Sequence, residues 1–547
     1  MPRVATMIRL TTLLVALGVS RATITSAQSE VTVDSGKLQG TTNADHSVRI
    51  FKGVPFAAPP VGDLRWKAPQ PPKKWSGVRA ADKFGPACLQ TDVFGDILQF
   101  MRDAPPSEDC LNLNIWLPAS ASASSKLPVY VWYYGGGFVA GGNSEKRYDG
   151  EALAKKGVIV VEPNYRLGVF GFLSHPELTK ESGHNSSGNY GLLDQAAALE
   201  WVVKNIAPFG GDPRNITIGG ESAGSASVSA LMASLLSRNL FQKAIGESGA
   251  FFSANPGALA FKPLADSEQV GVKFAEGIGA HSLAELRAKS GDELLQAAAK
   301  LNRGFIFGPN QDGYFMSTTA LAIYSKGEQA HVPLLAGWNA DEGKMQVLMN
   351  PQKPTAASFS EMAQKRFGDN AAEFLKLYPA ANDDEALVSA ETLSSDDFIA
   401  YSTWKWMDLQ VQTGKAPVYQ FHFEQVPKTK PGAMMGNIPA SEAGARHACE
   451  IEYVFQTLKF AQPEIPWADD DFKVSEAMAS YWSNFIKTGD PNGPGPDDKA
   501  LPRWPEYHSA DGTYQIMHLS GRNLGAARDT VRPRYLFLDS HSTPPAK

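Results

Sequence analysis

One short stretch of the chain has the residues expected of a serine nucleophile: Gly220-Glu221-Ser222-Ala223-Gly224. The pattern G-x-S-x-G is common by chance, so its surroundings decide what it means. A predicted strand, 215–219, precedes it, and apolar residues at helical spacing follow it. In a strand–turn–helix of this kind the serine backbone is strained and its hydroxyl is lifted clear of the sheet. Ser222 is therefore a candidate nucleophile.

The sequence also offers a base for this serine. A serine hydroxyl is a poor nucleophile until a base takes its proton, and an acid must hold that base in one tautomer. With a nucleophile at a strand–turn–helix junction, the acid and then the histidine follow along the chain. His447 lies in a stretch of small residues, Gly444 to Cys449, which leaves room for an imidazole. The other histidines after Ser222 are interpreted as strand, helix or surface residues: His281, His331, His422, His508, His518 and His541.

Two neighbouring carboxylates are candidates for the acid. Asp341 and Glu342 follow an apolar run, 332–337, that predicts a strand. The active sites of parallel sheets lie at the carboxyl ends of their strands, and these two residues fall at such an end. Spacing alone does not decide which of the two carboxylates points inward.

A glycine triplet is the candidate for binding the oxyanion of an acyl-transfer reaction. Gly135 to Gly137 end the predicted strand 129–133 and expose backbone N–H groups with no side chain in the way. The N–H of Ala223, directly after the candidate nucleophile, could complete such a site. The alternative interpretation of the triplet is a flexible turn.

The elements around these motifs predict an α/β fold, with a mostly parallel central sheet covered by helices on both faces. Two less regular regions, 260–330 and 350–410, are expected to form helical cap insertions beside the cleft. The proline-rich run 55–72 is expected to be an ordered coil. Further strands are predicted at 31–40, 48–53, 158–161, 244–246 and 418–423, and helices at 192–204 and 473–487.

The start of the chain has the pattern of a secretory signal peptide. Two arginines precede an apolar run, Leu10 to Val19, and small residues follow as far as Ala27. Cleavage after Ala27 is favoured, with Ala22 as the alternative, and residues 28–547 are expected to form a single domain. The run is short for a membrane span, so an uncleaved anchor is the weaker interpretation. We therefore expect a secreted or periplasmic protein with no membrane span in the mature chain.

Composition limits the classes of partner. The 547 residues are 43% hydrophobic and 20% charged, which is ordinary for a globular protein. The formal charge of −6 becomes −9 when residues 1–27 are removed, because three arginines and no acid leave with them. A modestly acidic chain has no electrostatic reason to bind nucleic acid. We expect a small-molecule substrate, no nucleic acid and no cofactor, and leave the oligomeric state open.

The cysteines fit an exported protein. Cys88, Cys110 and Cys449 allow one bridge and one spare thiol, and Cys88 and Cys110 are the closest pair in sequence. A bridge between those two would close a short loop, worth about 3 kcal/mol in the chain-entropy account. The cysteines form no metal-ligand cluster at a recognised spacing, so no metal site is expected.

Several longer stretches match one family. The chain resembles the type-B carboxylesterases, the cholinesterase-like branch of the α/β-hydrolase fold, over nearly all of its length after residue 27. The matching stretches are Phe51 to Ala57 with Pro59 to Gly62, Glu108 to Asn114, Asn164 to Gly168, Gly188 to Gln195, Phe209 to Pro213 and Tyr481 to Phe485.

The resemblance implies roles for individual residues. It makes Ser222 the nucleophile, His447 the base and Glu342 the acid, which settles the choice that spacing left open. It also implies that the oxyanion donors are Gly136, Gly137 and Ala223. Glu221 and Ser248 become supporting residues of the site, and Cys88 and Cys110 form a disulfide.

The chain departs from the family pattern at two places. Tyr134 stands before the glycine triplet, where many carboxylesterases have histidine; the donors are backbone groups, so we expect activity to survive. Cholinesterases hold choline by cation–π attraction to a tryptophan in the first disulfide loop. No tryptophan lies between Cys88 and Cys110, and Phe94 or Phe100 would be a weaker substitute. This argues against choline esters as the main substrate.

Together these features predict a secreted serine carboxylesterase that hydrolyses carboxylic esters to acid and alcohol through an acyl-serine intermediate. The alternatives are a more specialised lipase, feruloyl or toxin-type esterase, or a non-catalytic cholinesterase-like binding protein. The filled triad positions argue against the last of these. The sequence leaves open the natural ester, the acyl-chain preference and glycosylation at the sequons of Asn185 and Asn215.

Overall fold

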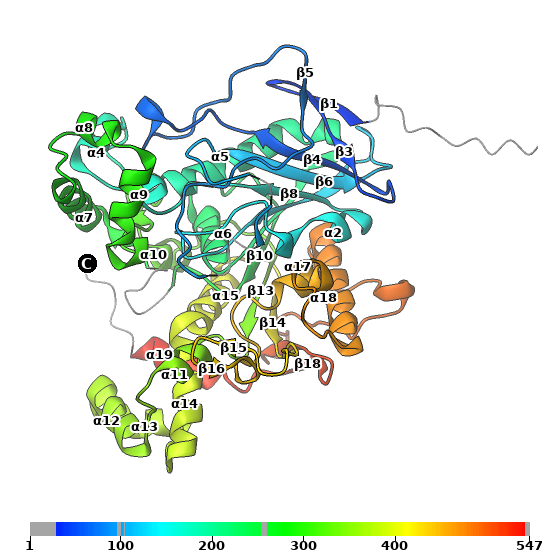
Figure 1. The fold of residues 1–547 in the computed structure, drawn as a ribbon. Coiled ribbons are helices and arrows are strands. Elements are labelled where there is room, and N and C mark those ends of the chain that lie inside the picture. The colour runs from blue at the N-terminus through cyan, green and yellow to red at the C-terminus, as the bar shows by residue number, and fades with distance from the viewer. Residues whose placement is uncertain (1–28, 96–99, 103, 253–259, 542–547) are drawn as a thin grey trace, which may run out of the picture.

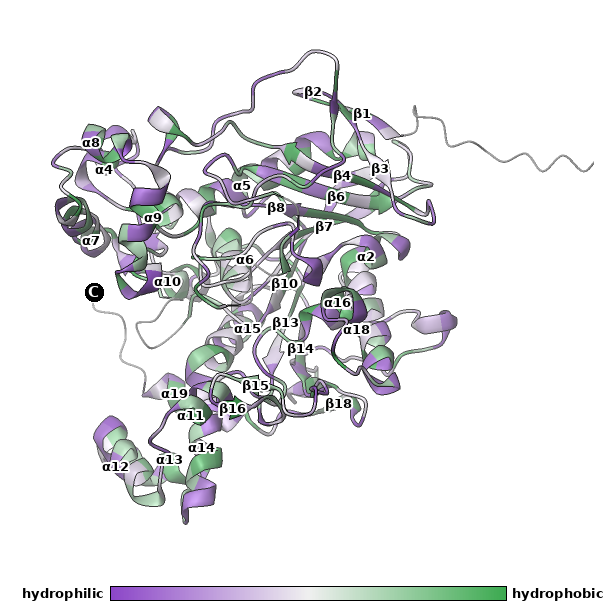
Figure 2. Ribbon diagram, viewed as in Figure 1, coloured by the Kyte–Doolittle hydropathy of each residue, from purple (hydrophilic) through white to green (hydrophobic). Residues whose placement is uncertain are grey.

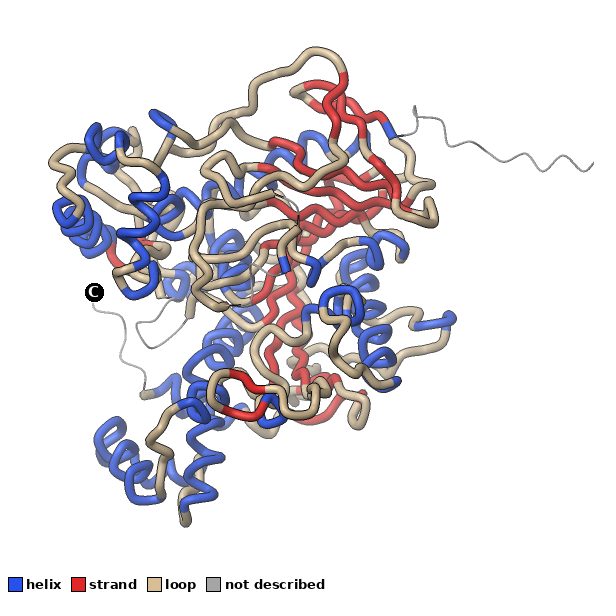
Figure 3. The backbone as a smooth tube through the Cα atoms, in the orientation of Figure 1, coloured by secondary structure: helices blue, strands red, loops and turns tan. Residues whose placement is uncertain are grey.

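The fold is built around one large sheet with helices on both sides. The computed structural model describes residues 29–95, 100–102, 104–252 and 260–541, so the predicted signal peptide lies outside the described residues. The sheet has 11 strands in the order β18-β17-β14-β13-β10-β9-β7-β8-β6-β4-β3. Figures 1 and 3 show these strands running through the middle of the molecule, flanked by helices. The predicted α/β class is confirmed.

The main sheet is parallel from β8 to β17 and antiparallel at both edges. The sequence did not predict β3, β6, β17 or β18. The strands are β3 (Thr41–Thr42), β4 (Val48–Pro55), β6 (Asn112–Pro118), β7 (Leu127–Tyr133), β8 (Ile159–Pro163), β9 (Gly211–Glu221), β10 (Lys243–Glu247), β13 (Leu334–Asn339), β14 (Val418–Phe423), β17 (Gln515–Leu519) and β18 (Leu524–Arg528). A separate three-stranded sheet contains β1 (Glu30–Val33), β2 (Gly36–Gln39) and β5 (Val78–Ala80).

The central strands are buried apolar runs, as parallel strands covered on both faces must be. Every residue of β8 and β10 is buried, and Figure 2 shows hydrophobic residues concentrated in the sheet. The helix α6 (Ala223–Ala233) is buried along its whole length and packs against β9 and β10. Its small residues allow this close approach. The junction of β9 and α6 is therefore held rigidly in the core.

Helices cover the sheet and form two insertions. The covering helices include α5 (Tyr190–Asn205), α15 (Tyr401–Thr413), α18 (Asp469–Thr488) and α19 (Arg532–Ser540). The first insertion contains α7 (Leu264–Gly277), α8 (Leu283–Ala288), α9 (Gly291–Ala299) and α10 (Ala320–Ser325). The second contains α12 (Ala356–Phe367), α13 (Ala371–Leu377) and α14 (Asp383–Ser395), which project at the lower left of Figure 1. A π-helical turn, η7 (Asp396–Ala400), joins α14 to α15.

The proline-rich segment 55–72 is an ordered coil, as predicted. Apart from the end of β4, its regular structure is a single 3-10 turn, η2 (Gly62–Leu64). Trp66 is buried and its indole N–H donates to the carbonyl of Val169 at 2.8 Å, which fixes the coil to the core. Among the helices in the described parts of the chain, none combines the length and the apolar composition needed to cross a bilayer.

Candidate active site

The turn between β9 and α6 has the geometry of a nucleophile elbow. Ser222 has φ 55° and ψ −120°, a region that costs a side chain roughly 1 to 3 kcal/mol. A Cβ added at Gly220 or Gly224 would lie 2.5 Å or 1.9 Å from the carbonyl oxygen of Tyr133 on β7. The Ser222 N–H donates to the carbonyl of Glu247 at 2.8 Å. The two glycines are therefore required because the neighbouring strand packs directly on the turn.

Three side chains from distant parts of the sequence form a hydrogen-bonded chain at this turn. Oγ of Ser222 lies 2.9 Å from Nε2 of His447, and Nδ1 of His447 lies 2.5 Å from Oε2 of Glu342. The other oxygen of Glu342 accepts from the hydroxyl of Ser248 at 2.6 Å and from the N–H of Asn339 at 2.8 Å. The carboxylate is buried and both of its oxygens are engaged, so its orientation is fixed.

Asp341, the other carboxylate at this strand end, points elsewhere. Its Oδ2 accepts from the N–H of Ala445 at 2.8 Å, and its own N–H donates to the carbonyl of Ala445 at 3.0 Å. Gly444 has φ 68°, and a Cβ there would lie 2.1 Å from Oδ2 of Asp341. Asp341 thus holds the loop that carries His447, and only glycine fits at the contact.

Buried carboxylates surround the imidazole of His447. Oε1 of Glu221 lies 3.3 Å from Nε2 of His447. Burial raises the pKa of Glu221, and the positive charge on His447 opposes this rise by favouring the ionised carboxylate beside the imidazolium. Burial alone would lower the pKa of His447, but Glu221 and then Glu342 outweigh it and raise that pKa to about 9. Glu450, which no sequence motif singled out, acts in the same direction. The site therefore stabilises a protonated imidazole.

The glycine triplet lies beside the elbow with free donors. A Cβ at Gly135 would come 3.0 Å from Cβ of Ser222, so this loop passes close to the serine. Gly136 and Gly137 have φ of 97° and 62°, and in the described residues their N–H groups enter no backbone hydrogen bond. Ala223 is the first residue of α6, where the N–H has no partner within the helix. The loop that carries two of the predicted donors thus passes beside the turn, and Ala223, the third, begins the helix that follows the turn.

Tyr134 anchors the start of the glycine loop. Its hydroxyl donates to the carbonyl of Tyr165 at 3.2 Å, and the Tyr165 hydroxyl donates to the carbonyl of Tyr134 at 2.8 Å. The two rings stack with their centroids 4.5 Å apart, and both residues are buried. This reciprocal pair fixes the backbone just before the donors without the histidine that many carboxylesterases have there.

Aromatic side chains from the insertions border the site. The Phe398 ring, on the π-helical turn η7, meets the His447 ring edge to face at 5.0 Å. The Phe305 ring lies against Gly137, where an added Cβ would be 2.6 Å from its Cε1. Phe94 packs edge to face on Phe305 at 5.9 Å. No motif predicted Phe305 and Phe398; the only signal for them was the presence of aromatic residues within the predicted insertions.

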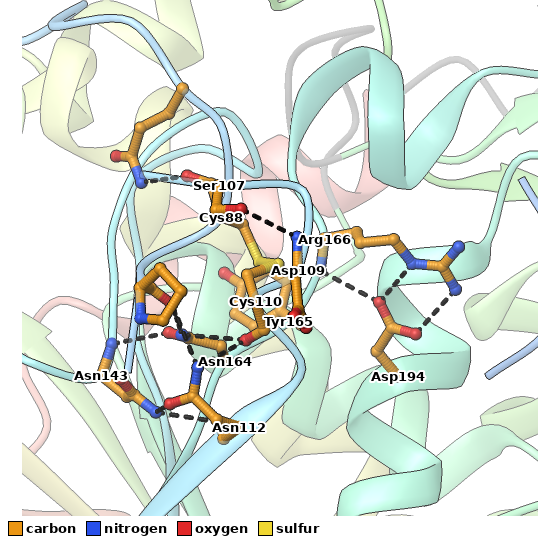
Figure 4. Close-up of a disulfide and its surroundings, with 12 residues drawn as sticks. Cys88, Ser107, Asp109, Cys110, Asn112, Asn143, Asn164, Tyr165, Arg166 and Asp194 are labelled. Carbon is orange, nitrogen blue, oxygen red and sulfur yellow. Dashed lines mark hydrogen bonds and ion pairs between the residues drawn. A yellow bond between two sulfur atoms is a disulfide. The ribbon is translucent and has the colours of Figure 1, made fainter. Parts of the chain in front are cut away.

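The cysteines anchor the loop that contains Phe94. Cys88 and Cys110 form the disulfide that the resemblance implied, and Figure 4 shows buried asparagines around it. The side-chain amides of Asn112 and Asn164 both donate to the carbonyl of Cys110, at 3.0 Å and 3.1 Å. Cys449 is a buried free thiol, and burial raises its pKa well above the usual value, so it is unreactive.

Comparison with known proteins identifies the family. The sequence profile of the carboxylesterase family matches residues 27–534. The chain belongs to the carboxylesterase family. It is 36% identical to fumonisin B1 esterase from Sphingopyxis macrogoltabida over 515 residues, which cover 90% of this chain and 87% of that one. It is also 36% identical to para-nitrobenzyl esterase from Bacillus subtilis (strain 168) over 496 residues, covering 87% of this chain and 92% of that one.

Solved structures of the family share its architecture. A structure of PNB esterase superimposes with a TM-score of 0.78 at 31% sequence identity, covering 94% of this chain and all of the other. This member of the carboxylesterase family therefore has the α/β-hydrolase fold. Its relatives are esterases, and it is a carboxylic ester hydrolase.

Proposed function

We propose that this carboxylesterase acts through an acyl-serine intermediate, with Ser222 as nucleophile, His447 as base and Glu342 as acid. The observation that carries the proposal is the continuous chain of short contacts from Oγ of Ser222 to the Glu342 carboxylate. Ser222 attacks the ester carbonyl carbon while Nε2 of His447 takes the hydroxyl proton. The same nitrogen gives that proton to the departing alcohol. His447 then activates a water molecule that attacks the acyl-serine and releases the acid.

The surrounding groups have supporting parts in this mechanism. The N–H groups of Gly136, Gly137 and Ala223 donate to the oxyanion of each tetrahedral intermediate, and one such donor is typically worth about 3 to 4 kcal/mol. Ser248 holds the Glu342 carboxylate in place through its 2.6 Å hydrogen bond. Glu221 adds a negative charge beside the imidazolium that forms during the reaction.

A serine-directed organophosphate tests the nucleophile. The purified protein is incubated with the reagent, digested and analysed by mass spectrometry. We expect one adduct per chain, on the peptide that contains Ser222, and loss of hydrolysis of a short p-nitrophenyl ester in step with it. Complete inactivation without an adduct on Ser222, or an adduct that leaves turnover intact, would contradict the proposal. A non-catalytic binding protein would take up no reagent.

Glu221→Gln is expected to move the pH dependence of the reaction. The charge of Glu221 favours the protonated form of His447, so its removal lowers the pKa of His447. The rate is lost as the pH falls through that pKa, because only the neutral imidazole can accept the serine proton. The acid limb of kcat/KM should therefore shift to lower pH, by about 1 to 3 units.

The measurement is kcat/KM for a neutral ester across the acid limb, which reports the pKa of the free enzyme. Glu361→Gln, on the exposed side of α12, is the matched control and should leave the limb in place. A limb that stays in place in Glu221→Gln, or that moves to higher pH, would show that Glu221 does not act through the charge on His447.

We also propose that the protein is exported, to the outside of the cell or the periplasm, as a single domain of residues 28–547. The support is the signal-peptide pattern of residues 1–27, followed by a family match that begins at residue 27 and continues to residue 534. The mass of the mature protein, purified from an exporting host, shows whether cleavage occurs after Ala27 or after Ala22. A protein that keeps all of residues 1–27 would contradict the proposed export.

The choice of ester is proposed to depend on the aromatic border of the site. Two relatives at the same identity are named for different esters, fumonisin B1 and para-nitrobenzyl esters, so family membership does not fix the substrate. Phe305 and Phe398 lie on opposite insertions and contact the oxyanion loop and the base, respectively. Their position favours esters with an apolar part near the reacting carbonyl.

A further inference from the structure

Two histidines and a glutamate converge on the sheet at β14 and β17. His422 and His518 are direct partners across these parallel strands, and Glu424 follows His422 by two residues. Residues two apart on a strand share a face, so all three side chains point to the same side of the sheet. Nδ1 of His422 and Nδ1 of His518 lie 3.0 Å and 2.6 Å from the same oxygen, Oε1 of Glu424.

This donor set suits a transition-metal ion. Two imidazoles and one carboxylate are the protein ligands of many zinc enzymes and of mononuclear iron sites. Three donor atoms of a tetrahedral zinc site lie about 3.3 Å apart, given bonds of about 2.0 to 2.1 Å. The potential ligand atoms of the trio all lie within 4.8 Å of one another, so small side-chain rotations would bring them into place.

The backbone holds the trio in a fixed arrangement. The Glu424 N–H donates to the carbonyl of Leu519 at 3.0 Å, which continues the β14–β17 ladder to the glutamate. The Trp338 ring, from the cross-strand partner of His422 on β13, lies 6.3 Å from the His422 ring and walls one side. Ligands on adjacent, hydrogen-bonded strands are positioned more precisely than ligands on loops.

The opposite side of the trio is open. Gly525 on the edge strand β18 is the direct partner of His518, and a Cβ added at Gly525 would meet nothing within 4 Å. The three side chains themselves are partly buried rather than fully enclosed. An ion can therefore enter from this edge, and water can complete its coordination.

We propose that His422, Glu424 and His518 bind one divalent transition-metal ion, with zinc as the best match, that ties the edge hairpin β17–β18 to the parallel sheet. The β14–β17 ladder covers only three residue pairs, Phe421–Met517 to Phe423–Leu519. An ion bonded to both strands therefore strengthens a short connection. This metal site is independent of the catalytic assignment. It differs from the expectation of no metal site, which was based on the cysteines and assigned His422 and His518 no function.

The competing explanation is a hydrogen-bonded trio without a metal, in which both rings donate to Glu424. Full-length protein stripped with a chelator is titrated with zinc by calorimetry, and the melting temperature is followed. We expect one ion per chain and a rise in Tm of about 3 °C. Cobalt at the same site should give the visible absorption of a low-coordinate ion. A stripped protein that binds no zinc with defined stoichiometry would overturn the proposal.

Variants locate the ion. His422→Asn and His518→Asn should each weaken zinc binding by about 100-fold or more, because loss of an outer partner alone costs 10- to 100-fold. Glu424→Gln keeps an acceptor for the ring hydrogens but is a poor ligand, so it should lose zinc while its metal-free Tm changes little. Glu424→Gln therefore tests whether the trio binds zinc even where a histidine variant fails to fold.

A matched control separates this site from weak surface binding. His508→Asn changes an exposed histidine in the same C-terminal region and should leave the affinity and the zinc-dependent rise in Tm unchanged. Retention of the ion by a folded His422→Asn/His518→Asn double variant, or by Glu424→Gln, would place the metal elsewhere and overturn the proposal.

Discussion

Ser222→Ala is expected to lower kcat for short p-nitrophenyl esters by about 10⁶-fold, the scale of nucleophile loss in a serine hydrolase. The serine Oγ is the atom that lies 2.9 Å from the imidazole, and alanine leaves no group there that can form the acyl intermediate. The residual rate, about 10³ to 10⁴ above water, would come from the oxyanion donors and from substrate binding. Steady-state kinetics with purified variant and parent protein measures the loss.

The variant should remain folded, because the substitution keeps the backbone that the elbow requires. Ser222 is 9% exposed, and its one side-chain hydrogen bond in the described residues is to His447. The melting temperature should therefore change by no more than about 2 °C. Ser441→Ala, on the exposed surface, is the control for preparation and assay. Turnover near the parent rate in a folded Ser222→Ala protein would rule out the acyl-serine mechanism.

The parts of the site that were predictable from sequence depend on local sterics. Gly220 and Gly224 are required because the carbonyl of Tyr133 approaches both positions, and this constraint leaves a five-residue pattern in the sequence. The central parallel strands were predictable for a related reason, since burial on both faces demands continuous apolar runs. The edge strands β17 and β18 carry mixed residues, including Arg528 and His518, and lack that signal.

Features set by contacts between distant segments could not be predicted in this way. Asp341 and Glu342 are adjacent in sequence. Only the contact of Asp341 with Gly444 and Ala445 shows that Asp341 holds the loop, which leaves Glu342 to face His447. Phe398 reaches His447 because the chain between α14 and α15 takes a π-helical turn. Such turns insert one residue into a helix and have no clear sequence pattern, although they are frequent at functional sites.

Glu342→Gln is the second variant with a large expected effect, because the amide would select the wrong histidine tautomer. Oε1 of Glu342 accepts from both Ser248 and Asn339, so the amide oxygen of glutamine must take that position. Its NH₂ group then faces Nδ1 of His447 and donates to it. The ring proton moves to Nε2, which can no longer accept the proton of Ser222.

We expect kcat to fall by about 10⁴-fold in Glu342→Gln, as for an equivalent acid-to-amide change in the serine proteases. Asp341→Asn is the matched comparison, one residue away with the same loss of charge. Its side-chain oxygen can still accept from the N–H of Ala445, so the loop keeps its anchor and kcat should fall by less than about 10-fold. Equal small losses in the two variants would refute Glu342 as the acid, and a larger loss in Asp341→Asn would transfer that role to Asp341. Because the two variants make the same carboxylate-to-amide change at adjacent residues, the difference between them isolates the hydrogen bond to Nδ1 of His447, which Glu342 accepts and Asp341 does not.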